Sequence, residues 1–493
     1  MHIGEVLYRV YDEEVGWRLT STSIKPVHLA NGLARAAQGA YYEASDLNKL
    51  LVWTKSSREL PERTLDALLR TELNDAIGCF DGDPKGFERL RRYARGLLNA
   101  EKAAFPSAEK SSYAITTGRM VTRDSNDRGL GDFIARTIDG TGLDETLREL
   151  LASKQPHDPL SALIWPALSG DERPYDVSAK SKRRRRRRSS FDQELSAAAE
   201  CLASHERRHG NHLRTMQRVV HFACAAIFAR AHALAAEDQL AKRTPALIAM
   251  SERRRSDLAH ASERSLELGF DRFEAWLAER LAALIEDEEP LKQGERPITA
   301  SSDARTVRRQ FKRIGSAKGG GRAPSDDDIE LRMSLWREAK LRDEELTPAR
   351  QIAHALVAAQ RFQSASGPPR AFIQALCRKA GLLYPHFQGA TLRKRVKPSV
   401  PMLDALVQSC VSASELVPLD VLLERLWTRF GLIVGGRRGP GWDDVAVLAD
   451  AGVDIDPSEL AANTELFVDE LASIGLARRY PDDITFVGDG HAS

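Results

Sequence analysis

The chain opens with an alternation of hydrophobic and polar positions. Val6, Tyr8 and Val10 share a period of two, an acidic turn follows at residues 12–14, and a second alternation runs over residues 15–19. A period of two is typical of β-strands with one buried face. The sequence therefore predicts an N-terminal β-hairpin.

From residue 61 onwards, apolar residues recur three and four positions apart, which is typical of helices that bury one face. Residues 191–287 are rich in alanine and leucine and contain one proline, Pro245, so we expect two or three long helices packed as a hairpin. Further helices are expected over 61–73, 87–98, 143–151, 329–341, 348–362 and 369–380. The predicted fold class is mainly α, with a small N-terminal α/β portion.

The last 95 residues carry the clearest start and stop signals for helices. Asp456 and Pro457 form an N-cap and a first-turn proline, while Gly431 and Gly475 each end an apolar helical pattern. The expected elements are helices over 416–430, 443–451 and 457–474, followed by a hairpin over 476–487. Three helices and a two-stranded wing are the order of a winged helix.

Two changes in composition mark boundaries along the chain. Eight of the nine residues from 180 to 188 are basic, and such a block repels itself and stays solvated. Residues 315–328 are rich in glycine and aspartate, which is typical of a flexible link. We expect an α/β domain over 1–177, a basic linker over 178–190, a long-helix bundle over 191–293, a flexible link over 294–328, a helical region over 329–398 and a winged-helix domain over 399–493.

Composition places the chain among globular proteins. Of 493 residues, 42% are hydrophobic and 29% are charged, which excludes wholesale disorder. The longest apolar stretch, 219–236, is interrupted by His221, Arg230 and His232, so we expect no membrane span. The five cysteines include no C-x-x-C pair, and residues 1–5 do not start a secretory signal. We therefore expect a cytoplasmic protein without a cofactor.

The net charge of +2 hides an uneven distribution. Residues 180–323 contain 30 Lys and Arg against 19 Asp and Glu, whereas residues 399–493 contain 6 against 16. A basic middle suits phosphate backbones, and an acidic end suits a basic protein surface. Alternatively, the two portions dock on each other within the chain.

Residues 205–209 match H-E-x-x-H, the pattern of many zinc peptidases. His205 and His209 would bind the metal and Glu206 would act as the base on its bound water. The two central residues are arginines, whose charges oppose a divalent cation. The alternative interpretation is a solvated helix end whose histidines and arginines face nucleic acid or solvent.

A second enzymatic interpretation rests on arginine and histidine spacing. Arg207 and His212, like Arg255 and His260, have the spacing that helical ribonucleases of the HEPN type use. Such a site needs a dimer that brings two histidines together for acid–base work on a 2'-hydroxyl. The phosphate-binding pattern G-x-x-x-x-G-K-[ST] is absent from the sequence, so nucleotide hydrolysis is not expected.

The basic side chains are more numerous than these catalytic candidates. No aromatic residues are interleaved with them, which favours contact with the nucleic-acid backbone over base reading. The candidates for nucleic-acid binding are Lys180, Lys182, Arg183, Arg184, Arg185, Arg186, Arg187, Arg188, Arg253, Arg254, Arg255, Arg308, Arg309, Lys312, Arg313, Arg393, Lys394 and Arg395.

The third helix of the predicted winged helix is acidic. A helix that lies in the major groove usually presents basic or amide side chains. Residues 457–474 contain no Lys or Arg, and four carboxylates there would be repelled by phosphates. The candidates for protein binding are therefore Glu459, Glu465, Asp469 and Glu470.

Residues 422–436 (LLERLWTRFGLIVGG) and 466–487 (LFVDELASIGLARRYPDDITFV) resemble the helical and winged-helix ends of accessory proteins in bacterial anti-phage defence operons. The resemblance implies a non-enzymatic subunit that binds DNA or bridges a nuclease or helicase partner. We therefore expect a nucleic-acid-associated adaptor with a basic middle and an acidic end. The alternatives are a metal-dependent or HEPN-like hydrolase and a structural helical scaffold.

Overall fold

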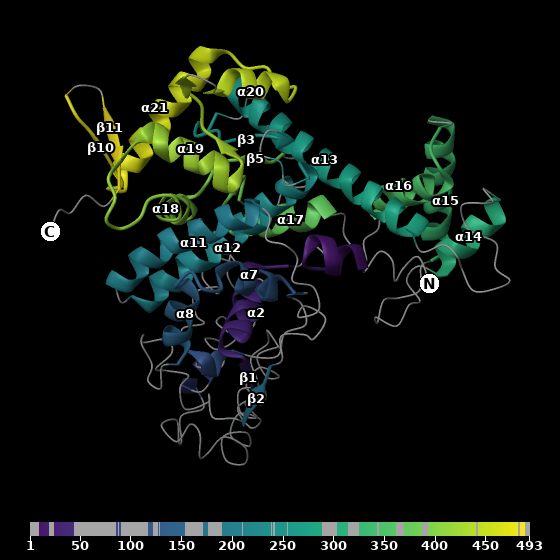
Figure 1. Cartoon of the computed structure of the whole chain (residues 1–493), viewed down its shortest axis with the longest axis horizontal. Coiled ribbons are helices and arrows are strands. Elements are labelled where there is room, and N and C mark those ends of the chain that lie inside the picture. The colour runs from purple at the N-terminus through teal and green to yellow at the C-terminus, as the bar shows by residue number, and fades with distance from the viewer. Residues whose placement is uncertain are drawn as a thin grey trace.

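The structure is a computed structural model, and it confirms a mainly helical fold (Figure 1). It describes residues 9–18, 24–43, 85–86, 88–89, 117–121, 127, 129–152, 171–175, 190–209, 211–237, 239, 242–253, 255–287, 303–313, 325–342, 345–360, 369–386, 393–439, 442–481 and 484–488. The helices expected over 61–73 and most of 87–98 lie outside these residues, as do residues 180–188 of the basic linker.

The predicted N-terminal hairpin is wrong where the structure describes it. Residues Tyr11–Val15 form a π-helical turn that ends at Gly16, which has a left-handed φ of 102°. Val10, Tyr11 and Val15 are buried, which is the spacing of a single helical face. So short a run of alternating residues fits both a strand and one helical turn.

The N-terminal part combines short helices with one small sheet. The helix predicted over 143–151 is confirmed as α8. Strand β1 pairs antiparallel with β2, from Ala40 opposite Pro174 to Glu43 opposite Asp171. The elements are α2 (Pro26–Gln38), β1 (Ala40–Glu43), a 3₁₀ turn (Gly118–Met120), α7 (Leu130–Ile138), α8 (Leu143–Leu151) and β2 (Asp171–Pro174).

Three long helices form the middle of the molecule, as predicted. They are α11 (Ser190–His209), α12 (His212–Ala235) and α13 (Asp257–Asp287). Helix α12 contacts α2, α11 and α13, and also α17 (Pro369–Lys379), α18 (Val400–Gln408) and α19 (Leu419–Phe430). Among the described helices it alone is long and apolar enough to cross a membrane, but 94% of its apolar window is buried inside the protein. Its apolar character is therefore explained by its place in the core.

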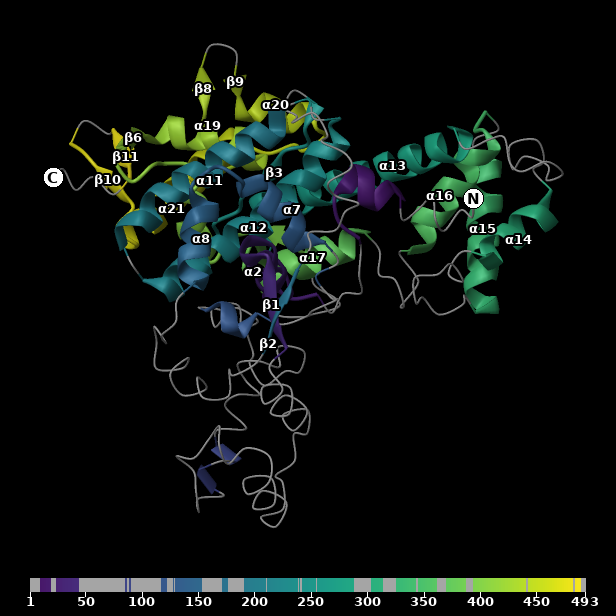
Figure 2. The same ribbon diagram turned by 60° about the horizontal axis from the view of Figure 1, so that its bottom comes forward.

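Helix α13 extends from the central body to a group of three helices, α14 (Ala304–Arg313), α15 (Asp326–Arg342) and α16 (Pro348–Gln360) (Figures 1 and 2). Residues 304–313 and 326–328, predicted as part of a flexible link, instead form α14 and begin α15. The Ser325 hydroxyl accepts from the Asp328 amide at 3.1 Å, and the Asp328 carboxylate accepts from the Ser325 amide at 3.0 Å. This reciprocal cap satisfies two amides at the helix start.

The C-terminal elements follow the predicted order. Helix α19 ends at Gly431 with a left-handed φ of 70°, and the Asp456 side chain caps α21. Residues 417–418, predicted as helical, form β6, which pairs with β11 to give the sheet order β10-β11-β6. The elements are α17 (Pro369–Lys379), β4 (Leu383–Tyr384), β5 (Arg395–Val396), α18 (Val400–Gln408), β6 (Val417–Pro418), α19 (Leu419–Phe430), β7 (Leu432–Ile433), β8 (Arg438–Gly439), β9 (Trp442–Asp443), α20 (Asp444–Asp450), α21 (Pro457–Ser473), β10 (Ala477–Arg479) and β11 (Thr485–Val487).

Segments far apart in the sequence meet beside the start of α13. Strand β3 (Ala246–Leu247) pairs in parallel with β7, and Ile248 forms a parallel bridge with Val396 of β5. One hydrophobic cluster includes buried residues from Val10 to Val487. The ranges predicted as an α/β domain, a long-helix bundle, a helical region and a winged helix thus contribute to one core.

Candidate nucleic-acid interface

The H-E-x-x-H residues whose side chains are described lie in the core. His205 and Glu206 are 1% and 5% exposed, so the predicted solvated helix end is wrong for this pair. The His205 Nε2 atom lies 2.7 Å from the carbonyl oxygen of Val411. His209 ends α11, and its side chain lies outside the described part of the chain, as does that of Arg207.

The carboxylate of Glu206 is occupied by neighbours on α12. It accepts a hydrogen bond from the hydroxyl of Thr215 and lies 3.0 Å from Nη1 of Arg218. Arg218 also contacts Asp404 at 2.8 Å. Within the part of the chain that is described, no three His, Cys, Asp or Glu side chains gather where they could hold a metal ion. The arrangement favours a structural ion network over a base poised beside zinc.

Neither arginine–histidine pair lies within a single helix. Arg207 is in α11, whereas His212 begins α12 after Asn211, whose side chain accepts from the Arg214 amide at 3.1 Å. Arg255 lies in the turn before α13, and His260 is exposed in its first turns. In both pairs the arginine and the histidine therefore lie in different local structures.

The structure brings two of the predicted basic segments together. The backbone carbonyls of Ser251 and Arg253 accept hydrogen bonds from Arg395 at 2.9 and 3.2 Å. Residues 251–253 therefore lie against the segment 393–397, while Arg254 is outside the described residues. The side chains that form what we term the β5 surface are Arg253, Arg255, Arg378, Arg393, Lys394 and Lys397.

Arg395 itself does not belong to this surface. The side chain is 2% exposed, and its guanidinium carbon lies 5.0 Å from the centre of the Tyr384 ring. Because its Nη1 and Nη2 atoms donate to backbone carbonyls and the side chain is buried, Arg395 holds the two basic segments together and is not placed to contact a phosphate. The prediction that it binds nucleic acid is wrong for this reason, whereas Arg253, Arg255 and Arg393 are exposed.

Two members of the β5 surface are attached to the β4–β5 hairpin. Arg378 Nη1 donates to the carbonyl of His386 at 2.9 Å, and Lys394 Nζ donates to the carbonyl of Pro385 at 3.1 Å. Lys397 lies over the Tyr384 ring at 5.4 Å. It also pairs at 2.9 Å with Glu252, whose side chain is 81% exposed. These contacts fix where the cations sit.

The cations of this surface repel one another. Burial lowers the pKa of Lys394, and the charge of Arg378 lowers it further. Burial also lowers the pKa of His386, with further lowering from Lys397, Lys394 and Arg378. The pKa of Lys379 falls to about 8 through burial and the charges of Arg378 and Lys25. A bound anion would relieve this repulsion, because opposite charge stabilises protonated groups.

A second basic surface lies on α14, on the group of helices at the far end of α13 (Figure 2). Arg309 and Lys312 are exposed, and Arg308 pairs with Glu330 at 2.5 Å. Arg313 ends α14, and its side chain is outside the described residues. Strand β5 contacts α13 at Ser262 and α16 contacts it at Glu279, so these two contacts are about 25 Å apart along α13.

The four predicted protein-binding carboxylates lie along α21. Glu465 and Asp469 both pair with Arg479 of strand β10, at 2.8 and 3.1 Å. Glu459 and Glu470 are half-buried on the same helix. Part of the acidic charge is thus neutralised by the hairpin.

Sequence reasoning missed Arg378 and Lys379 of the basic region. They end α17, where basic side chains also complement the helix dipole, so their presence there has a local explanation. They lie at the end of the helix predicted over 369–380 and precede residues 393–397 closely in sequence. This closeness is the signal that could have identified them.

The fold and the basic surfaces together define a mainly helical protein with a concentrated positive surface beside its longest helix. A scan against protein-family models and a search of curated protein sequences give no match to this chain.

Proposed function

We propose that this protein is a non-catalytic adaptor that binds the DNA backbone through its basic surfaces and a protein partner, such as a nuclease or helicase subunit, through its acidic C-terminal region. Bacterial anti-phage defence is the setting that the C-terminal resemblance suggests. The observation that carries the proposal is that Arg395 holds residues 251–253 against β5, close to Lys394 and Arg378 of the β5 surface.

Backbone contact follows from the chemistry of this surface. Its exposed groups are guanidinium and ammonium ions, which bind phosphates without regard to sequence. Because these cations repel one another, neutralising them with phosphates is favourable. Because the hairpin contacts already hold them in place, binding costs little conformational entropy. The α14 surface, on the group of helices at the far end of α13, would extend the contact to a second part of a duplex.

The C-terminal order of elements supports a winged-helix module in this proposal. A hairpin follows α21 and is joined by β6 in the order β10-β11-β6. Because α21 carries no Lys or Arg and its Glu465 and Asp469 face Arg479, this module suits a protein partner better than a DNA groove.

The test is binding of a random duplex of about 30 base pairs at several salt concentrations, with strand integrity followed in the same samples. Replacing Arg253, Arg255 and Arg393 by glutamine should weaken binding and reduce the salt slope by about 3, since each phosphate contact contributes about 0.9. The strands should stay intact. Equal slopes for the wild type and this variant would contradict the proposal.

The matched control replaces three other exposed arginines by glutamine, and it should leave the salt slope unchanged. These are Arg148, Arg214 and Arg350, whose side chains are 52%, 54% and 48% exposed. Replacing Glu459 and Glu470 by glutamine should also leave DNA binding unchanged, because the proposal assigns them to the protein partner. If serine at Arg183 to Arg188 also flattens the salt slope, the basic linker shares the role of the β5 surface.

A further inference from the structure

A cavity of about 470 Å³ lies between the end of α12, α13, α19 and α20, away from the residues of the β5 surface. Its walls include the cations Lys242 and Arg272, the indoles of Trp427 and Trp442, and the carboxylate of Asp450. Pockets for small molecules typically occupy about 300–1,000 Å³ and combine apolar walls with a few polar groups. This cavity has the size and the composition of such a site.

The aromatic wall is fixed in place. The ring centres of Trp427 and Trp442 lie 5.2 Å apart with 53° between their planes. The Trp442 indole donates to Asp444 at 2.6 Å, and the Arg437 guanidinium lies 4.6 Å from the Trp442 ring centre. A planar ligand would thus meet an ordered indole and would not have to order it on binding.

Trp427 is the buried part of this aromatic wall. Its side chain is 3% exposed, and its indole N–H has no hydrogen-bond acceptor among the described residues. Buried polar groups are nearly always paired, and an unpaired donor costs roughly 1–3 kcal/mol. Because that nitrogen has almost no accessible surface, Trp427 contributes a fixed aromatic backing to the wall and no hydrogen bond to a ligand.

The cations stand beside this aromatic wall. Arg272 donates to the Thr244 hydroxyl at 3.0 Å, which orients its guanidinium. Lys242 lies 3.8 Å from Glu237, and both side chains are more than half exposed, so this pair is weak. Lys242 and Arg272 can therefore both turn their charge to an anion, while Asp450 can accept a hydrogen bond from an amino or hydroxyl group.

We propose that this cavity binds a nucleoside phosphate. The class is chosen because one molecule must supply a planar ring for the aromatic wall, a donor for Asp450 and an anion for Lys242 and Arg272. A free phosphate lacks the ring, and an aromatic acid lacks the donors. The site goes beyond the proposed DNA contact, since it shares no residue with the β5 surface.

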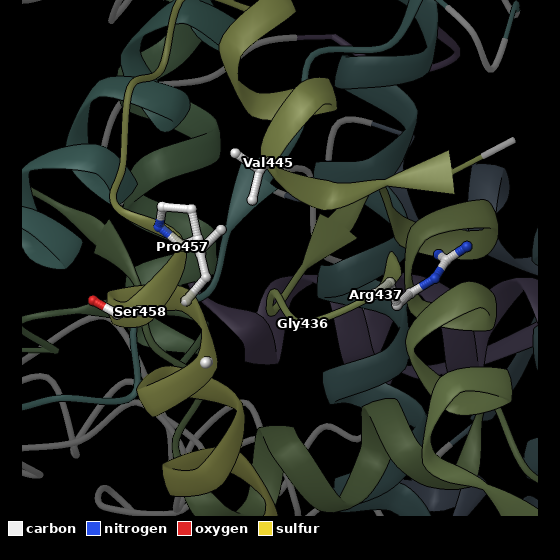
Figure 3. A pocket seen from close by; sticks show the side chains of 7 residues that line it. Gly436, Arg437, Val445, Pro457 and Ser458 are labelled. Carbon is white, nitrogen blue, oxygen red and sulfur yellow. The ribbon is translucent and has the colours of Figure 1, made fainter. Parts of the chain in front are cut away.

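A second cavity, of about 420 Å³, is less suited to such a ligand (Figure 3). It lies beside the start of α21 and is lined mainly by small and apolar groups. In Figure 3 the side chain of Arg437 points away from Pro457 and Ser458. The amide of Ser458 is already bonded to Asp456, so the start of the helix offers no comparable anion site.

The test is calorimetric titration of the full chain with AMP, GMP, CMP and UMP, with adenosine and inorganic phosphate alongside. We expect at least one monophosphate to bind, adenosine to bind at least 10-fold more weakly than AMP if AMP is a ligand, and phosphate alone not to bind. Lys242→Gln with Arg272→Gln should weaken monophosphate binding at least 10-fold and leave nucleoside binding unchanged. Trp442→Leu should weaken both.

Controls and competitors complete the experiment. Arg309→Gln with Lys312→Gln removes the same charge from exposed positions on α14 and should change nothing. The β5 surface variant should bind monophosphates normally, which separates this proposal from the DNA contact. Competition by a 5'-phosphorylated oligonucleotide but not its 5'-hydroxyl form would identify a strand end as the source of the ligand. Competition by neither would identify a free nucleotide.

No binding of any monophosphate at millimolar concentration would overturn the proposal. So would equal binding by the wild type and both cavity variants, or binding of inorganic phosphate as tight as that of the monophosphates.

Discussion

Arg218 and Glu206 form a buried ion pair, with 3.0 Å between Nη1 and Oε1 and side chains that are 2% and 1% exposed. Arg218 also contacts Asp404 on α18, so one cation joins α11, α12 and α18. Removing one partner of such a pair leaves an uncompensated buried charge, which costs about 3–5 kcal/mol. We expect Arg218→Met to lower the free energy of unfolding by that amount in urea titrations.

The exposed pair between Arg350 and Glu279 supplies the control. Both side chains are nearly half exposed, so Arg350→Met should cost less than about 1 kcal/mol. Glu206→Gln further separates the structural and enzymatic interpretations. A structural network predicts a loss of stability, whereas a stable Glu206→Gln protein that has lost a metal-dependent hydrolytic activity would contradict our interpretation.

Gly269 in α13 faces the imidazole of His232 in α12. A Cβ atom at Gly269 would lie 2.2 Å from Cε1 and 2.8 Å from Nδ1 of that ring. Alanine favours a helix over glycine by about 1 kcal/mol, but this overlap is against a ring packed between Phe228 and Phe270. We expect the steric overlap to outweigh the gain in helix propensity, so Gly269→Ala should destabilise the protein by about 1–3 kcal/mol in urea titrations.

A double-mutant cycle checks the cause. In a His232→Ala background the space is open, so adding Gly269→Ala should be neutral or stabilising by up to about 1 kcal/mol. If Gly269→Ala destabilises both backgrounds equally, contact with the imidazole is not the reason.

Two buried histidines make stability depend on pH. Burial lowers the pKa of both His221 and His232 from 6.5 to about 4. The unfolded chain therefore binds protons in this range before the folded chain does. Stability is complete above pH 6.5 and falls as the pH drops towards 4, by up to roughly 3 kcal/mol for each histidine.

Urea titrations at pH 7.5 and 4.5 measure this effect. His221→Gln should reduce the difference in unfolding free energy between the two pH values, because glutamine does not titrate there. His260→Gln alters an exposed histidine and should leave that difference unchanged. An undiminished pH difference in the His221 variant would show that this imidazole is accessible to protons in the folded state.

Local signals explain how far the fold could be predicted from the sequence. Gly431, Asp456 and Gly475 act within one helical turn, and α19 and α21 end or begin beside them. The pairing of β3 with β7 has no such signal, since each strand has two residues and the partners are distant in sequence. A two-residue strand shows no period, so only the tertiary packing selects it.

The candidate site likewise combines residues that the sequence identifies with contacts that only the tertiary structure creates. Arg253, Arg255 and Arg393 were recognisable as candidate phosphate contacts by charge alone, but the approach of their two segments depends on the bridge between Ile248 and Val396. For H-E-x-x-H, a complete local motif is misleading about the environment of its residues. The motif is complete within five residues, yet the burial of Glu206 is set by partners on the next helix and on α18, which the motif does not include.

Arg370, at the start of α17, lies against three carboxylates of α13. Its guanidinium contacts Glu267 at 2.9 Å, Asp271 at 2.5 Å and Glu274 at 2.7 Å. Although burial acts to lower its pKa, the hydrogen bonds and charges of Glu274 and Asp271 raise the pKa overall. Glu274 is only 3% exposed as a side chain, so losing the cation would strand a buried charge.

We therefore expect Arg370→Met to destabilise the protein by about 3–5 kcal/mol in urea titrations. Arg370→Lys should cost less, because it keeps the charge but not the planar fork that reaches three carboxylates at once. Adding Glu274→Gln to Arg370→Met should recover part of the loss, since no buried charge remains at that position. Equal losses for the Met and Lys variants would mean that Arg370 acts through packing of its stem, and that the carboxylates of α13 are satisfied by solvent.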